Sequence, residues 1–468
     1  MKTPRFLFLA AAPFLVLAFC GTASAAPDYD ELAKSARATL AAMIETDTSN
    51  PPGNEGRIVQ IVAKRLKDAG VPYEITEFEP GRRNIVARLK GTGPEKPLML
   101  LAHIDVVGAD GQAWTVPPHK LTEKDGFLYG RGTGDMLGMA AINLETFLDL
   151  KRSGAPLRRD VILAMTGDEE SGGKGISYVL AHAPKSIDAG FVLNEGGKPT
   201  LGDDGKVRFV NLVGAEKIYE DFELVAKGKT GHSSVPLDDN AIYRLSEALA
   251  RLGRFKFPAR LLPVTRAYFA ARASVETPEI AAAMRALAAS AGELPADAVK
   301  TIDAEPLLMP ALRTTCVATL LSAGTRVNAL PAEAKANVNC RVLPDETLEQ
   351  VRAVLARVLA DPAVEIRPVS PFAQAGPSPV EGADIDAVRK IIGEMWPGVP
   401  VIPSMSYGAS DSLFLRQAGI EAYGLSPIVN TDADGRRAHG IDERIPVSSL
   451  RTGVEFYGRL ARELAVAR

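Results

Sequence analysis

The sequence predicts an α/β fold with a mostly parallel sheet, interrupted by an inserted α+β domain. From Tyr29 to about Val213, short apolar runs bounded by turn residues alternate with segments of helical period. The pattern then changes to alternating strands with helices, and the α/β pattern returns at about Ile366. The chain has 468 residues, which favours two domains because single cores rarely grow beyond about 250–300 residues.

The first α/β segment alternates helices with strands. Its expected helices lie at Tyr29–Glu45, Glu55–Ala69 and Asp135–Arg152, with another beginning near Lys174. Its expected strands lie at Ile85–Leu89, Pro97–Ala102, Val161–Thr166 and Phe191–Asn194. Strands that alternate with helices indicate a parallel sheet covered on both faces.

The segment after Val213 has the pattern of a smaller α+β domain. Its expected strands lie at Tyr219–Lys227, Thr314–Ser322 and Lys335–Leu343, and its expected helices at Asn240–Leu252 and Leu348–Leu359. An Ala-rich helical stretch, about Thr277 to Val299, indicates an added lobe. We therefore expect a large domain at 26–213 and 366–468, with a second domain inserted at 214–365.

The first 25 residues have the features of a signal peptide. Lys2 and Arg5 precede the apolar run Phe6–Phe19, and Ala23-Ser24-Ala25 fits a cleavage site. We expect residues 1–25 to direct export, so that the mature protein is periplasmic or secreted. No later apolar run approaches the length of a membrane helix.

Composition excludes one class of partner. Hydrophobic residues make up 46% and charged residues 24%, and the net charge is -3. These values are ordinary for a soluble globular protein. No basic run is present, so nucleic acid is not expected as a partner.

Two motifs with histidine and aspartate lie between the expected strand Pro97–Ala102 and the start of the expected helix Asp135–Arg152. His103 and Asp105 follow an apolar strand and are two residues apart, so both point to one face. This spacing suits a metal-bound imidazole oriented by a carboxylate, and also a purely structural pair. Asp135 follows the glycine-rich run Gly130–Gly134. Its carboxylate either belongs to a functional site or caps the N-terminus of the following helix. A phosphate loop is excluded because no Gly-Lys-Ser/Thr follows.

Acidic residues follow two buried strands. Asp168-Glu169-Glu170 follows one strand and Glu195 follows another. Sites of open α/β sheets lie beyond the carboxyl ends of strands, and adjacent acids repel unless a cation or separate roles relieve them. With His439 near the C-terminus, the candidate ligands are His103, Asp135, Glu170, Glu195 and His439. Mixed imidazole and carboxylate donors without cysteine favour a catalytic zinc site.

These ordered motifs resemble the M20-type zinc metallopeptidases, which include glutamate carboxypeptidase and aminoacylase-1. The resemblance covers nearly the whole mature chain. Ala215-Glu216-Lys217 and the run from Gly231 through His232 to Pro236 are most similar to the carboxypeptidase S and N-acyl amino acid hydrolase branch. The implied fold is a zinc-peptidase catalytic domain with an inserted lid and dimerisation domain.

The resemblance implies a role for each site residue. His103 and Glu195 would bind one zinc, Glu170 and His439 the other, and Asp135 would bridge them. Asp105 would orient His103, and Glu169 would be the general base. From the lid, His232 would stabilise the oxyanion, often across a dimer interface. Asn328 and Arg341 would hold the substrate and its carboxylate; Asn339 departs from the Asp common in the family.

The implied enzyme carries two Zn²⁺ per subunit, for which Co²⁺ or Mn²⁺ can substitute. It would be a carboxypeptidase or dipeptidase that cleaves an amide bond adjacent to a free carboxylate, or an N-acyl amino acid deacylase. The sequence does not separate these activities. A third hypothesis, a binding protein on an inactive hydrolase scaffold, conflicts with the intact ligand set and Glu169.

Assembly and disulfide pairing are further expectations. We expect a homodimer through the lid domains with His232 acting in the partner's site, although the Ala-rich lobe could instead complete the site of a monomer. Cys316 and Cys340 lie in two strands that we expect to be opposite each other, so they could pair. The alternative is two buried, unpaired thiols.

Overall fold

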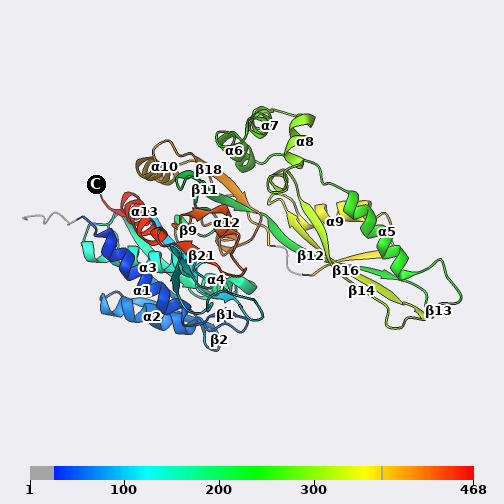
Figure 1. Ribbon diagram of the computed structural model, residues 1–468, viewed down its shortest axis with the longest axis horizontal. Coiled ribbons are helices and arrows are strands. Elements are labelled where there is room, and N and C mark those ends of the chain that lie inside the picture. The colour runs from blue at the N-terminus through cyan, green and yellow to red at the C-terminus, as the bar shows by residue number, and fades with distance from the viewer. Residues whose placement is uncertain (1–25, 370–372, 468) are drawn as a thin grey trace, which may run out of the picture.

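The computed structural model describes residues 26–369 and 373–467, and the predicted signal peptide at 1–25 lies outside these residues. Figure 1 shows a large α/β body at one end and an elongated smaller domain at the other. The large body is built on a ten-stranded sheet and the smaller domain on a four-stranded sheet. The expected α/β fold with an inserted α+β domain is confirmed.

The ten-stranded sheet has a parallel centre, one antiparallel flank and one flank of mixed direction. Its order is β2-β3-β8-β4-β9-β19-β11-β10-β20, with β18 paired to β11. The strands are β2 (Tyr73–Glu79), β3 (Arg82–Leu89), β4 (Glu95–His103), β8 (Arg159–Thr166), β9 (Phe191–Asn194), β10 (Pro199–Leu201), β11 (Val207–Glu216), β18 (Val401–Ser406), β19 (Ala422–Gly424) and β20 (Asn430–Thr431). Strands β8, β4, β9 and β19 are mutually parallel, so their carboxyl ends meet at one edge.

Helices cover both faces of this sheet. One face packs on α1 (Tyr29–Ile44), α2 (Gly56–Asp68), α3 (Leu137–Ser153), α10 (Ala383–Met395) and α13 (Ser448–Ala465). The other packs on α4 (Lys174–His182) and α11 (Ser412–Gln417). In β4, Leu98 and Leu100 enter the first core while Met99 and Leu101 enter the second. Burial on both faces explains why this strand is continuously apolar in sequence.

The inserted domain has one covered sheet face and one open face. Its strand order is β14-β16-β12-β17, with β12 (Ile218–Lys227), β14 (Thr315–Ala323), β16 (Glu333–Val342) and β17 (Val364–Pro368). Along β16, buried and half-buried residues alternate. The buried set packs on α5 (Ala241–Arg254) and α9 (Leu348–Leu359). The intervening residues, Arg341 among them, lie on the open face.

A helical lobe sits at the junction of the two domains. It contains α6 (Pro263–Arg272), α7 (Pro278–Ala289) and α8 (Ala296–Asp303), with its own apolar core. Helix α6 packs against β18 of the large sheet (Figure 1). The lobe therefore contacts the large body at the junction, while the far end of the inserted sheet projects away from it.

Two crossings connect the domains. Lys217 separates β11 from β12, and the chain returns after Pro368. The limits predicted at residues 213 and 365 lie a few residues before these crossings, and we propose the crossings as the domain limits.

Cys316 and Cys340 are paired residues of β14 and β16 and form a disulfide, with Cα atoms 4.0 Å apart. The proposed pairing is therefore confirmed. Within the described residues, every helix falls short of the length and apolar character needed to span a membrane.

Candidate metal centre

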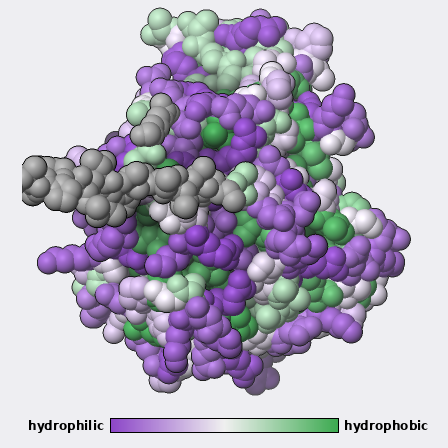
Figure 2. Space-filling model, turned by 90° about the vertical axis from the view of Figure 1, so that its left-hand side faces the viewer, coloured by the Kyte–Doolittle hydropathy of each residue, from purple (hydrophilic) through white to green (hydrophobic). Residues whose placement is uncertain are grey.

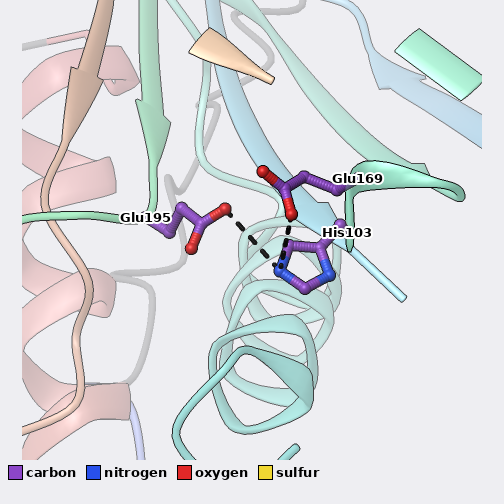
Figure 3. A group of neighbouring side chains, drawn as sticks. All are labelled: His103, Glu169 and Glu195. Carbon is purple, nitrogen blue, oxygen red and sulfur yellow. Dashed lines mark ion pairs between the residues drawn. The ribbon is translucent and has the colours of Figure 1, made fainter. Parts of the chain in front are cut away.

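Three parallel strands deliver the central side chains of the site. His103 ends β4, Glu169 begins the short 3₁₀ turn that follows β8, and Glu195 follows β9. Figure 3 shows these three side chains converging on one point. Nε2 of His103 lies 3.6 Å from Oε1 of Glu195 and 4.0 Å from Oε2 of Glu169. The meeting of parallel strand ends explains this convergence of residues far apart in sequence.

Asp135 lies between the two histidines. Its Oδ1 is 3.2 Å from Nε2 of His103, and its Oδ2 is 3.2 Å from Nε2 of His439. Nε2 of His439 is also 3.0 Å from Oε2 of Glu170. Each oxygen of Asp135 thus faces a different imidazole, as a carboxylate that bridges two metal ions would.

The N-cap interpretation of Asp135 does not apply. Helix α3 begins at Leu137, its N-cap is Met136, and no side chain caps it. The carboxylate of Asp135 points at the histidines, and its backbone N–H donates to Glu443 over 3.0 Å. The glycine-rich run therefore places the carboxylate of Asp135 between His103 and His439.

The donor set fits divalent metal ions. Ligand atoms of His103, Glu169 and Glu195, and those of His103, Asp135 and Glu170, lie within 4.8 Å of one another. Among the described residues, the buried Oε1 atoms of Glu170 and Glu195 have no hydrogen-bond donor. Four carboxylates crowd around two imidazoles, and cations relieve such repulsion.

The nearby carboxylates raise the pKa values of both histidines. Burial alone would lower the pKa of His103, but the carboxylates of Glu195, Asp105 and Asp135 outweigh it and raise the pKa well above its usual value. Hydrogen bonds to Asp135 and Glu170 raise the pKa of His439 to about 10. Metal ions and protons therefore compete for these nitrogens.

Glu169 differs from its neighbours in environment. Burial raises the pKa of its carboxyl well above the ordinary value, and the nearby Asp411 adds to this while His103 opposes it. Burial likewise raises the pKa of Glu195, with the charge of Glu169 adding to the effect. A carboxyl with a raised pKa is suited to accept and return a proton near neutral pH.

Asp105 organises the acidic turn as well as the histidine. Nδ1 of His103 is 3.0 Å from the backbone oxygen of Asp105 and 3.6 Å from its Oδ1. The same carboxylate accepts the backbone N–H groups of Glu169 at 3.1 Å and Glu170 at 3.2 Å, and the amide of Asn50 at 2.8 Å. Asp105 therefore fixes the direction of both acids relative to His103.

Glu443 and Arg131 hold the second half of the site, and sequence reasoning gave them no role. The buried Glu443 carboxylate accepts from Gly132 N at 3.0 Å, Gly134 N at 2.8 Å and Arg131 Nη1 at 2.8 Å. Arg131 Nη2 also donates to the backbone oxygen of His439 over 3.3 Å. The pair thus ties the loop of Asp135 to the loop of His439. The one sequence signal was an acid four residues after His439.

Arg341 lies on the open sheet face next to the domain junction. Its Nη1 donates to the backbone oxygen of Tyr407 over 3.2 Å, and its Nε to Oδ1 of Asn339 over 3.3 Å. Its guanidinium carbon is 4.6 Å from the ring centroid of Tyr219. Asn339 in turn donates to Asp221 over 3.0 Å. Asn339 thus links the guanidinium of Arg341 to the carboxylate of Asp221.

His232 and Asn328 lie at the opposite end of the inserted domain. His232 belongs to β13 (Gly231–His232), which pairs with β15 (Ala329–Leu330), and Ser233 N donates to Asn328 O over 3.0 Å. Both residues are exposed, and Figure 1 shows β13 at the tip farthest from the large body. From Arg341 back to Glu333, β16 alone spans roughly 25 Å. One chain in this conformation does not bring them to the metal-binding residues.

The chain is similar to known proteins over most of its length. The sequence profile described as peptidase family M20/M25/M40 matches residues 99–463. The N-fatty-acyl-amino acid synthase/hydrolase PM20D1 of Xenopus tropicalis is 30% identical over 374 residues, which cover 78% of this chain and 72% of that protein. Mouse aminoacylase-1 is 25% identical over 430 residues, covering 89% and 92%.

Solved structures share the architecture. The M20 family metallo-carboxypeptidase Sso-CP2 from Sulfolobus solfataricus superposes with a TM-score of 0.68 at 20% identity, over 91% of this chain and 98% of that one. The likeness extends across both domains and shows that the fold, including the inserted domain, is common to these proteins.

Proposed function

The chain belongs to the M20/M25/M40 peptidase family, and we propose that it is an exported hydrolase that uses two zinc ions to cleave an amide bond beside a free carboxylate. The observation that carries this proposal is the position of Asp135 between His103 and His439, at 3.2 Å from each. In this assignment His103 and Glu195 hold one zinc, and Glu170 and His439 hold the other.

The proposed chemistry divides between the metals and the protein. Two zinc ions would lower the pKa of a water molecule and polarise the scissile carbonyl. Glu169 takes the proton of that water and delivers it to the leaving nitrogen. Arg341, already fixed by Tyr407 and Asn339, grips the substrate carboxylate with a charge-assisted hydrogen bond.

A homodimer would complete the site. Strand β14 is at the edge of the inserted sheet and pairs with β16 alone among the described strands. Its side chains Val317, Leu320 and Leu321 are 61%, 71% and 67% exposed. Unpaired edges with apolar side chains favour pairing with another chain. By contrast, the opposite end of the molecule is largely hydrophilic where grey atoms do not cover it (Figure 2).

The position of His232 supports the same assembly. The side chain is exposed at the far tip, and its Nδ1 is 2.8 Å from Oγ of Ser234. A second copy joined through the inserted domains could present its own tip to this chain's metal centre. The helical lobe sits at the junction and packs on β18, so it leaves the β14 edge free. We therefore favour His232 acting in the partner's site as the oxyanion donor.

Two activities share this chemistry, carboxypeptidase or dipeptidase cleavage and N-acyl amino acid deacylation. The names of the relatives support both, since they include a carboxypeptidase and aminoacylase-1. The test is a panel of dipeptides and N-acyl amino acids, each with its C-terminally amidated counterpart, assayed with the zinc-loaded protein. We expect hydrolysis of the free carboxylates and much slower hydrolysis of the amides. Equal rates on both series would exclude the role of Arg341.

A further inference from the structure

A cavity opens beside the metal centre and contains a lysine that the proposed mechanism does not use. Its volume is about 190 Å³, and Asp135, Glu195 and Lys198 are among its lining residues. All of its lining residues come from the large body, and none from 214–365. The cavity adjoins the metal centre through Asp135 and Glu195, and it is a separate space from the surface that carries Arg341.

Lys198 is built into the wall of this cavity. Its Nζ donates to Oδ1 of Asn430 and lies against Gly435, where an added Cβ would come within 2.2 Å of it. Burial lowers the pKa of the amine to about 8, and Asp432 and Asp434 partly oppose this from a distance. Among residues 26–369 and 373–467, no carboxylate forms an ion pair with Lys198. One hydrogen bond leaves two of its three donors available.

The acids that line the cavity each have a positive partner of their own. Glu443 pairs with Arg131 at 2.8 Å, and Asp434 pairs with Arg444 at 2.8 Å. Asp135 and Glu195 face the histidines and the proposed metal ions. Lys198 is thus the lining charge that lacks an opposite charge, and a buried charge without a partner is unfavourable.

We propose that this cavity is a subsite for a short acyl group that ends in a carboxylate, which Lys198 binds. The inference rests on the proposed amide hydrolysis, because the acyl carbonyl must lie at the metal centre. The leaving amino acid is held on the lid side by Arg341, so the cavity in the large body faces the acyl side. Its volume is below the about 300–1,000 Å³ of pockets for larger ligands, which disfavours a long alkyl chain. Water adds across the C–N bond and releases a dicarboxylate and the free amino acid.

The test compares two substrates that differ only in charge. These are N-glutaryl-L-phenylalanine and its 4-carbamoylbutanoyl counterpart, assayed with the zinc-loaded full chain. We expect kcat/KM to favour the charged acyl group by about tenfold or more, the effect of one hydrogen bond to a charged group. In Lys198→Met and in Lys198→Gln this ratio should fall to about one. Lys206→Met, at an exposed lysine in the turn before β11, should keep the wild-type ratio.

The other outcomes separate the two proposals. N-acetyl- and N-oleoyl-L-phenylalanine are assayed as references. Turnover of these without a preference for the charged acyl group overturns the subsite and leaves the hydrolase proposal intact, as does an unchanged ratio in both Lys198 variants. Failure to hydrolyse any amide overturns the hydrolase proposal and the subsite with it. If Lys198→Met instead abolishes the preference for free over amidated leaving groups, Lys198 binds the amino acid carboxylate and the acyl-side assignment is wrong.

Discussion

The large body and the inserted domain differ in how closely their candidate site residues lie together. In the large body, the side chains of His103, Asp135 and Glu195 already meet, and His103 is 1% exposed. In the inserted domain, Arg341 is fixed near the junction, while His232 is exposed at the far tip. The ends of parallel strands, together with the loops that Arg131 and Glu443 join, assemble the candidate metal-binding half. The other half depends on how domains and subunits are placed.

The largest effect is expected in the large body, where Glu169→Gln and Glu170→Gln should have different consequences. Glu169→Gln should retain both metals and lose activity by about 10²–10⁴-fold, as for a lost general base. Glu170→Gln should lose metal, because its carboxylate faces His439 at 3.0 Å. Metal content and turnover are measured on the same samples. Loss of metal from the Glu169 variant alone would show that the two roles are exchanged.

Variants of His232 test the contribution of the inserted domain to the site. His232→Ala should reduce kcat by about 10²–10³-fold, the effect of removing one oxyanion donor. Mixing it with Glu169→Gln should restore activity if the residue acts in the partner's site, to about a quarter of the wild-type level for random exchange into C2 dimers.

Subunit exchange and molecular mass are confirmed by light scattering and native mass spectrometry. If heterodimers form but the mixture does not regain activity, His232 acts in the site of its own chain. A monomeric wild-type protein with full activity would contradict the dimer.

A variant of Glu443 tests whether metal binding depends on the contact between the loop of Asp135 and the loop of His439. Glu443→Gln weakens the contacts to Arg131, Gly132 and Gly134 and should lower metal affinity about 10–100-fold, as for other outer-shell partners. Affinity is measured by chelator competition, with the exposed Glu381→Gln as the matched control. Unchanged affinity would mean that the loops hold their positions without this carboxylate.

The junction between the two regions gives the smallest predicted effect. Lys217 is fully buried, and its Nζ donates to the Arg313 carbonyl over 2.6 Å. Burial lowers the pKa of Lys217 to about 7, below the value of about 10.4 for an exposed lysine. Between these values the unfolded chain binds more protons, so this lysine makes the free energy of unfolding rise with pH.

Urea denaturation at pH 7, 8.5 and 10 measures this dependence. The wild type should gain stability relative to Lys217→Met as the pH rises, whereas the exposed Lys227→Met should follow the wild type. A constant difference between wild type and Lys217→Met across the three pH values would contradict the lowered pKa.

Sequence patterns predicted the fold, and they predicted that acidic and histidine side chains gather at the carboxyl ends of the strands, because both follow from local rules. Apolar runs gave β4, β8 and β9, and the ends of parallel strands meet, so His103, Glu169 and Glu195 could be grouped before their distances were known. The pairing of Cys316 with Cys340 followed from two adjacent antiparallel strands.

Other features depend on contacts that sequence patterns do not encode. The Arg131–Glu443 pair joins loops 312 residues apart. The sequence around an acidic loop residue does not indicate which distant residue it will contact. The contact between Asn339 and Asp221 depends on the register of β12 against β16. The distance of His232 from the metal centre depends on domain orientation, which neither residue type nor spacing specifies.

A metal titration measures how many metal ions the enzyme needs for hydrolysis. The protein is stripped with a chelator until elemental analysis finds no metal, and zinc is then added in steps while hydrolysis of a dipeptide and an N-acyl amino acid is followed. A site bridged by Asp135 between His103 and His439 predicts no turnover at the start and a plateau at two zinc ions per chain. Full activity in the metal-free protein would contradict the two-metal assignment.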